Sequence, residues 1–103
     1  MKQIAVYSNN NISSETISML KDFFSMEDIV VFSSAPYNID DPSIATVAVY
    51  YMSFYDGIVV FLNESDMKKY VSTLKSSNIF LMAANSIISI DTKEIKNELR
   101  SSV

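Results

Sequence analysis

Short apolar runs rich in β-branched and aromatic residues alternate along the chain with segments of helical spacing. Four of these runs predict strands, and two of them, over residues 29–32 and 57–62, are typical of strands buried on both faces. A fifth run has the pattern of a short edge strand. The five predicted strands cover residues 2–7, 29–32, 57–62, 79–83 and 86–90. A turn at Ala84-Asn85 is expected to join the last two.

The segments between these runs predict helices. Ser13 is a suitable N-cap for a helix over residues 14–25. Asn63 is placed to cap another, whose apolar face holds Met67, Tyr70, Val71 and Leu74. A last helix is expected from Asp91, with a solvated basic stripe formed by Lys93, Lys96 and Arg100.

The segment 42–55 permits two interpretations. Asp41 followed by Pro42 is typical of a helix start, and Gly57 would then lie near the helix end, which favours a helix over residues 42–55. The alternative is a strand, because residues 46–51 have high β propensity and Asp56-Gly57 is a common hairpin dipeptide.

Alternation of strands and helices predicts one α/β domain over residues 1–103. We expect a three-layer, flavodoxin-like fold with a mostly parallel sheet, in which the first four strands have the order 2-1-3-4 and the fifth lies at the edge. The opening strand, polar loop and amphipathic helix resemble a receiver domain of two-component signalling. Ser8-Asn9-Asn10 and Leu62-Asn63 stand where receivers carry acidic residues and the phosphorylated aspartate. The resemblance therefore implies an unphosphorylated pseudo-receiver.

Composition excludes several chemistries. The chain has no histidine, no cysteine and one glycine, so imidazole catalysis, thiolate chemistry, His or Cys metal ligands and a glycine-rich phosphate loop are absent. We expect no cofactor, no metal site and no enzymatic activity of the lone chain. A net charge of −4, with lysine and arginine residues scattered along the chain, disfavours binding of nucleic acid through its phosphates. No apolar stretch is long enough to cross a membrane, and the first is too short for a signal peptide, so a cytoplasmic protein is expected.

Polar loops at the strand ends form a candidate ligand site. In open α/β sheets, ligands bind beyond the carboxyl ends of the strands, where the strand order reverses. The sequence places candidate ligand-binding residues there: Ser8, Asn9, Asn11, Ser13, Asn63 and Glu64. They could hold a small polar metabolite or a nucleotide, although Ser and Asn are also common turn and cap residues. Asp40 and Asp41 could likewise bind a hard cation or simply cap the next helix.

An uncharged aromatic segment is the other candidate site. Residues 42–55 contain no charged side chain, so a helix there would lack a polar outer face. The sequence predicts an interface formed by Val47, Tyr50 and Phe54. The first hypothesis is therefore a non-catalytic regulatory or inhibitory interaction domain that forms a homodimer and binds a protein partner. The second hypothesis is a ligand-binding domain, and the third is a catalytic subunit completed by a partner.

Overall fold

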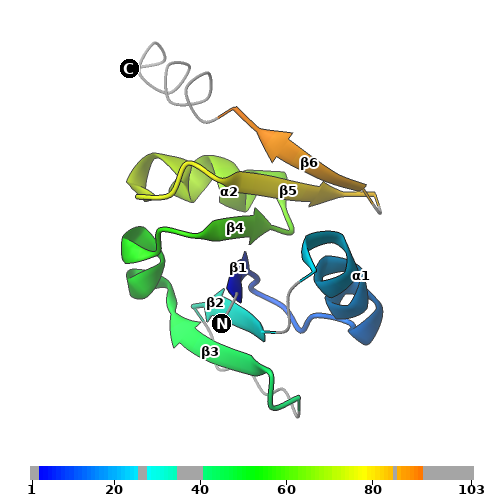
Figure 1. The fold of residues 1–103 in the computed structure, drawn as a ribbon. Coiled ribbons are helices and arrows are strands. Elements are labelled where there is room, and N and C mark those ends of the chain that lie inside the picture. Colours follow the sequence, from blue (N-terminus) through cyan, green and yellow to red (C-terminus); the bar gives the residue numbers. More distant parts are fainter. Residues whose placement is uncertain (1–2, 26–27, 35–40, 85, 92–103) are drawn as a thin grey trace.

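One six-stranded sheet organises the molecule. The computed structural model describes residues 3–25, 28–34, 41–84 and 86–91. The sheet consists of β1 (Gln3–Tyr7), β2 (Asp28–Ser33), β3 (Ile44–Ala48), β4 (Ile58–Phe61), β5 (Ile79–Ala83) and β6 (Ser86–Ile90). Their order is β3-β2-β1-β4-β5-β6, so that β3 and β6 form opposite edges (Figure 1). The first five strands are parallel, and β6 pairs antiparallel with β5. The predicted α/β class is confirmed.

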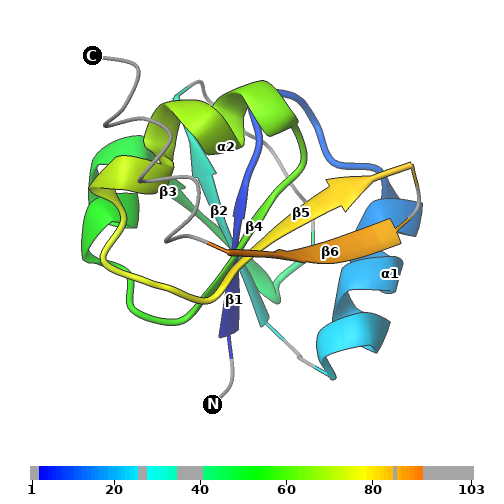
Figure 2. The same cartoon turned by 90° about the horizontal axis from the view of Figure 1, so that it is seen from above.

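Helices lie against both faces of this sheet. Helix α1 (Ser14–Phe24) packs on one face. The other face carries helix α2 (Glu64–Tyr70) and two 3-10 helices, η1 (Val49–Phe54) and η2 (Val71–Thr73). Figure 2 shows α1 and α2 on opposite sides of the strands. The central strands are apolar at successive positions because both of their faces are covered.

Two apolar cores result, one under each helical layer. The core under α1 contains Ile4, Val6, Leu20, Ile29, Val31 and Val60. The core under α2 and the 3-10 helices is larger and contains Ala5, Tyr7, Phe32, Met52, Val59, Phe61, Met67, Val71, Leu74, Ile79 and Leu81. Alternate residues of one strand enter different cores, as the pleat of a strand requires.

The N-caps predicted at Ser13 and Asn63 are confirmed. The Ser13 hydroxyl accepts a hydrogen bond from the backbone N–H of Thr16 at 3.2 Å. The side-chain oxygen of Asn63 accepts from the backbone N–H groups of Ser65 and Asp66, at 2.7 and 3.4 Å. Each cap satisfies backbone donors that have no partner within the first helical turn, which explains why both helices begin where the sequence predicts.

The helix predicted over residues 42–55 is wrong. Ile44–Ala48 is strand β3, parallel to β2, and Val49–Phe54 is a 3-10 helix. Asp41 is not a helix cap: its carboxylate accepts hydrogen bonds from the backbone N–H and the hydroxyl of Ser43, at 2.9 and 2.7 Å. This Asx-type turn directs the chain into β3. The alternative interpretation was right about a strand but not about a hairpin, because η1 separates β3 from β4.

The predicted sheet order also needs correction. Strand β3, which was not part of the predicted order, lies beside β2 at the edge of the sheet, so the strand order is 3-2-1-4-5-6. A flavodoxin-like fold is not confirmed. The neighbours expected among the other five strands are present. Residue Ala84 turns the chain between β5 and β6 with a left-handed φ of 48°. Asp40 and the last helix, with Lys93, Lys96 and Arg100, lie outside the described residues.

Candidate functional site

A small pocket lies at the carboxyl ends of β1 and β4, where the strand order reverses. Its volume is about 340 Å³, and it is lined by Tyr7, Ser8, Asn9, Asn10, Asn11, Leu62, Asn63, Ser65 and Asp66. The loops from β1 to α1 and from β4 to α2 supply most of these residues, while Tyr7 ends β1 and Ser65 and Asp66 lie in the first turn of α2. We refer to this site as the loop pocket.

Hydrogen bonds inside the loop pocket occupy much of its polar lining. The Ser8 hydroxyl donates to the backbone carbonyl of Asn10 and accepts from the Asn10 N–H at 3.1 Å. The side-chain oxygen of Asn9 accepts from the hydroxyls of Tyr7 and Ser34, both at 2.9 Å. These contacts fix the loop after β1.

Tyr7 forms the buried wall of the loop pocket. Its side chain is 1% exposed, and its ring lies 5.0 Å from the ring of Tyr70 and 5.8 Å from that of Phe61. Burial raises the pKa of Tyr7 to about 12, and the neighbouring Tyr70 hydroxyl acts in the same direction. The phenol is therefore neutral at physiological pH. Among the described residues, Asp66 is the only carboxylate that lines the pocket, and no lysine or arginine does.

The structure brings together only part of the predicted ligand set. Ser8, Asn9, Asn11 and Asn63 line the loop pocket. Ser13 and Glu64 do not: Ser13 caps α1, and Glu64 points to solvent in an ion pair of 3.4 Å with Lys68. The sequence reasoning missed Tyr7 and Asp66 as lining residues.

An exposed aromatic cluster lies on η1. Tyr50, Tyr51 and Phe54, which we call the aromatic cluster, are 69%, 58% and 62% exposed. The ring of Tyr50 packs edge-on against the other two, with centroid distances of 5.3 Å to Tyr51 and 5.5 Å to Phe54. Of the predicted interface residues, Tyr50 and Phe54 belong to this cluster. Val47 is half-buried against the core below, and Tyr51 was missed.

Two contacts fix η1 on the sheet. Met52 is 1% exposed and enters the core under α2. Tyr55, directly after η1, donates its hydroxyl to the backbone carbonyl of Gln3 at 2.9 Å and packs edge-on against Phe32. Burial raises the pKa of Tyr55. The cluster is thus displayed from a segment whose other side is anchored.

No metal centre is found among the described residues. Groups of three or more His, Cys, Asp or Glu side chains are absent from that part of the chain. Asp41 instead forms an ion pair of 3.3 Å with Lys21, whose ammonium also donates to the Ser43 hydroxyl at 2.6 Å. Hydrogen bonds from Ser43, followed by that from Lys21, lower the pKa of Asp41.

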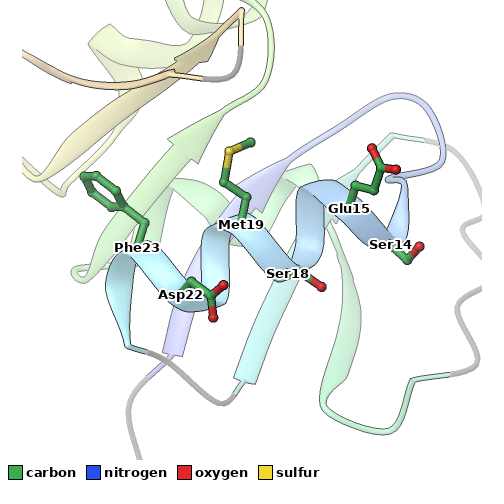
Figure 3. A pocket seen from close by; sticks show the side chains of 6 residues that line it. All are labelled: Ser14, Glu15, Ser18, Met19, Asp22 and Phe23. Atoms are coloured by element: carbon green, nitrogen blue, oxygen red, sulfur yellow. The ribbon is translucent and has the colours of Figure 1, made fainter.

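A wider hollow of about 710 Å³ runs along the outer side of α1. Figure 3 shows its lining in two rows, with Glu15, Met19 and Phe23 along one side of the helix and Ser14, Ser18 and Asp22 along the other. Every lining residue belongs to the same helix, so no second element closes the hollow. It is an open surface and lacks the walls that bury most of a small ligand.

Comparisons with known proteins supply no relative. The chain matches no protein-family model, no curated protein and no solved structure. Among the described residues, no helix is long and apolar enough to cross a membrane.

Proposed function

We propose that this protein is a non-catalytic interaction module that binds protein surfaces, its own copy included, through the aromatic cluster. One observation carries the proposal. Among the described residues five large apolar side chains are exposed, and three of them, Tyr50, Tyr51 and Phe54, lie on η1. Tyrosine is enriched among the residues that dominate binding energy at protein interfaces.

The size of the cluster supports this proposal. An aromatic side chain offers about 200 Å² of surface, so the exposed fractions of the three rings together amount to about 400 Å². Contiguous apolar patches of this order on soluble proteins commonly mark interaction sites. An isolated exposed leucine would carry no such meaning.

The attachment of η1 to the sheet also supports the proposed interaction function. The buried Met52 and the Tyr55 hydrogen bond hold η1 against the sheet. A partner therefore meets rings whose backbone is already ordered, which lowers the entropy cost of association. The absence of charge over residues 42–55 means that no ion has to be desolvated when this surface is covered.

A charge placed on the cluster tests the proposal. We expect wild-type protein at micromolar concentration to self-associate, and Tyr50→Glu to weaken this association at least about 30-fold, because the new carboxylate loses its hydration in the contact. Light scattering after size exclusion measures the mass, and circular dichroism checks the fold. Ser72→Glu adds the same charge on η2, at another exposed position, and should leave the association unchanged. Equal association of Tyr50→Glu and wild type would overturn the proposal.

The loop pocket supports a second candidate function, binding of a small uncharged polyhydroxylated ligand. Its lining of amides, hydroxyls and the Asp66 carboxylate offers partners for ligand hydroxyl groups. The strand order is the one found in doubly wound dinucleotide-binding sheets. No glycine and no cationic side chain of the described residues lines the pocket, so a phosphate group is not favoured. A thermal-shift screen of sugars and nucleosides tests this candidate, with Asp66→Asn as the variant that should lose any shift.

A further inference from the structure

We propose that a second copy of this chain binds at the open edge of β3, so that two sheets join through antiparallel β3–β3 pairing across a two-fold axis. The inference rests on the proposed function and deepens it, because it names the strand pair that brings two aromatic clusters into one dimer.

Within the part of the chain that the structure describes, strand β3 is an edge of the sheet without the usual protection. Natural edge strands are commonly blocked by a charge, a proline or a bulge. Ile44–Ala48 has the sequence IATVA, pairs with β2 in continuous register, and contains neither a charge nor a proline. Its residues Ala45, Thr46 and Ala48 are exposed. The outer side of β3 therefore offers backbone groups to another strand.

The hydrogen-bonding pattern identifies which backbone groups face outward. The backbone N–H of Ile29 in β2 donates to the carbonyl of Ser43 at 3.0 Å, so Ser43 faces β2. The N–H of the next residue, Ile44, faces the other way and donates to the carbonyl of Asp41 at 3.1 Å. Because successive residues of a strand alternate in direction, the N–H and C=O of Thr46 also point away from β2.

Thr46 is the middle residue of β3, which makes the strand suited to pairing with itself. With a two-fold axis at Thr46, the two copies of this residue form a hydrogen-bonded antiparallel pair and exchange both N–H···O bonds. Their side chains meet as a β-branched cross-strand pair, which favours sheet pairing. No side chain in the strand brings like charges together, although the chain as a whole has a net charge of −4.

The area needed for a stable dimer also argues for the strand. The aromatic clusters of two copies expose together about 800 Å², whereas stable protein interfaces bury about 1,200–2,000 Å² in total. The cluster alone is therefore too small. Strand β3 ends at Ala48 and η1 begins at Val49, so the edge and the cluster follow each other in the chain. Pairing of the two β3 edges would bury further area in addition to that of the clusters.

The opposite edge is a weaker candidate. Strand β6 (sequence SIISI) is also uncharged, but Ile88 is its only exposed large apolar residue. Pairing of β3 with β6 would join copies head to tail and generate rings or open polymers, whereas β3–β3 pairing closes at two copies. A particle mass that stops at the dimer distinguishes the two arrangements.

Substitutions at Thr46 test the pairing. Thr46→Lys places two like charges opposite each other at the axis, and Thr46→Pro removes the outward N–H while the ladder to β2 stays intact. We expect each variant to raise the dimer dissociation constant at least about tenfold in sedimentation equilibrium. The control Thr46→Val keeps the N–H and the side-chain volume and should associate like wild type. Urea denaturation of each variant confirms that the monomer is folded.

A single cysteine tests the register, since the chain has none of its own. Paired residues at the axis have Cα atoms about 5.5 Å apart, a separation that a disulfide can bridge. Thr46→Cys should therefore form a covalent dimer on oxidation at micromolar concentration, and Ser72→Cys should not.

The pattern of results separates this inference from the proposed function. A dimer that is lost in Tyr50→Glu but kept in Thr46→Lys and Thr46→Pro overturns the β3 pairing and leaves the proposed function standing. A dimer that is lost only in the Thr46 variants supports the pairing and removes the role of the cluster. Wild-type protein that stays monomeric at high micromolar concentration, or that forms polymers without a limit at two copies, also overturns the pairing.

Discussion

Replacement of the only glycine tests how η1 is fixed to the sheet. A Cβ atom added at Gly57 would lie 2.9 Å from Cε1 and from the hydroxyl oxygen of Tyr55, closer than real Cβ contacts. Gly57 has no positive φ, so its backbone would accept alanine. Gly57→Ala therefore acts through the Tyr55 ring, which has to move away.

The displaced ring loses two contacts. One is the hydrogen bond from its hydroxyl to the Gln3 carbonyl, which contributes about 1 kcal/mol, and the other is the edge-on packing against Phe32, which contributes about 0.5–1.5 kcal/mol. Alanine also reduces the entropy of the unfolded chain, which returns about 0.4–1 kcal/mol. We expect Gly57→Ala to lower the free energy of unfolding by about 0.5–2 kcal/mol.

Urea denaturation measures this loss. The chain has no tryptophan, so far-ultraviolet circular dichroism is the suitable signal. A small domain has an m-value of about 1–3 kcal/mol per molar urea, and the midpoint should fall by roughly 1 M. In a Tyr55→Ala background the obstructing ring is gone, so the same substitution should be neutral or slightly stabilising. An equal loss in both backgrounds would refute the steric reasoning.

Three further substitutions check other local contacts. Asn63→Ala should lower the free energy of unfolding by about 1 kcal/mol because two backbone donors of α2 lose their cap, whereas Asn63→Asp keeps an acceptor and should be nearly neutral in urea denaturation. Ala84→Gly should raise the free energy of unfolding by about 0.5–1 kcal/mol, since Ala84 has a left-handed backbone; Ala83→Gly, in the extended strand β5, should lower it. The pKa of about 12 at Tyr7 means that the native state retains this proton, so the stability it supplies is complete below about pH 10 and is lost as the pH rises towards 12. Absorbance at alkaline pH should show a late tyrosine ionisation near pH 12 that Tyr7→Phe removes; a titration identical in this variant would contradict the assignment.

The sequence predicted a strand or helix correctly where the local preference for that conformation coincided with a pattern of buried residues. Strands β1, β4 and β5 are uninterrupted apolar runs and lie at or near the centre of the sheet. Helices α1 and α2 begin directly after Ser13 and Asn63, whose side chains cap the first turn as the sequence predicts. In these strands the residues that favour the extended conformation also supply the buried faces.

The helix prediction for residues 42–55 was wrong because the sequence pattern after Asp41 is compatible with two structures, a helix and a strand. An aspartate followed by proline starts a helix when the carboxylate caps the next turn, but the same carboxylate can bind Ser43 and Lys21 and turn the chain into a strand. The pairing of β3 with β2 decides between the helix and the strand. The local sequence of residues 44–48 does not reveal which strand they pair with. The sequence shows that residues 42–55 carry no charge, but the open sheet edge at β3 could not be predicted while this segment was expected to be a helix.

The loop pocket was predictable only in outline. Its place follows from the strand order, which brings the loops after β1 and β4 together. Tyr7 and Asp66 were not predicted, because whether they line the pocket depends on the direction in which each side chain points. The side chains of Tyr7 and Val6 lie on opposite faces of the sheet, and Asp66 lies in the first turn of α2. The period-two alternation of β1 could have assigned Tyr7 to the α2 face.

The central place of β1 also affects how the chain can fold as it is synthesised. Ile4 pairs with Ile29 on one side and with Ile58 on the other, so β1 acquires its second neighbour only after β2, β3 and η1 have emerged. Contacts between such distant residues form slowly. During that interval β1 presents an apolar edge that β4 later covers, and it is open to wrong partners. Translation speed before residue 58 should therefore affect how much of this protein reaches its native state.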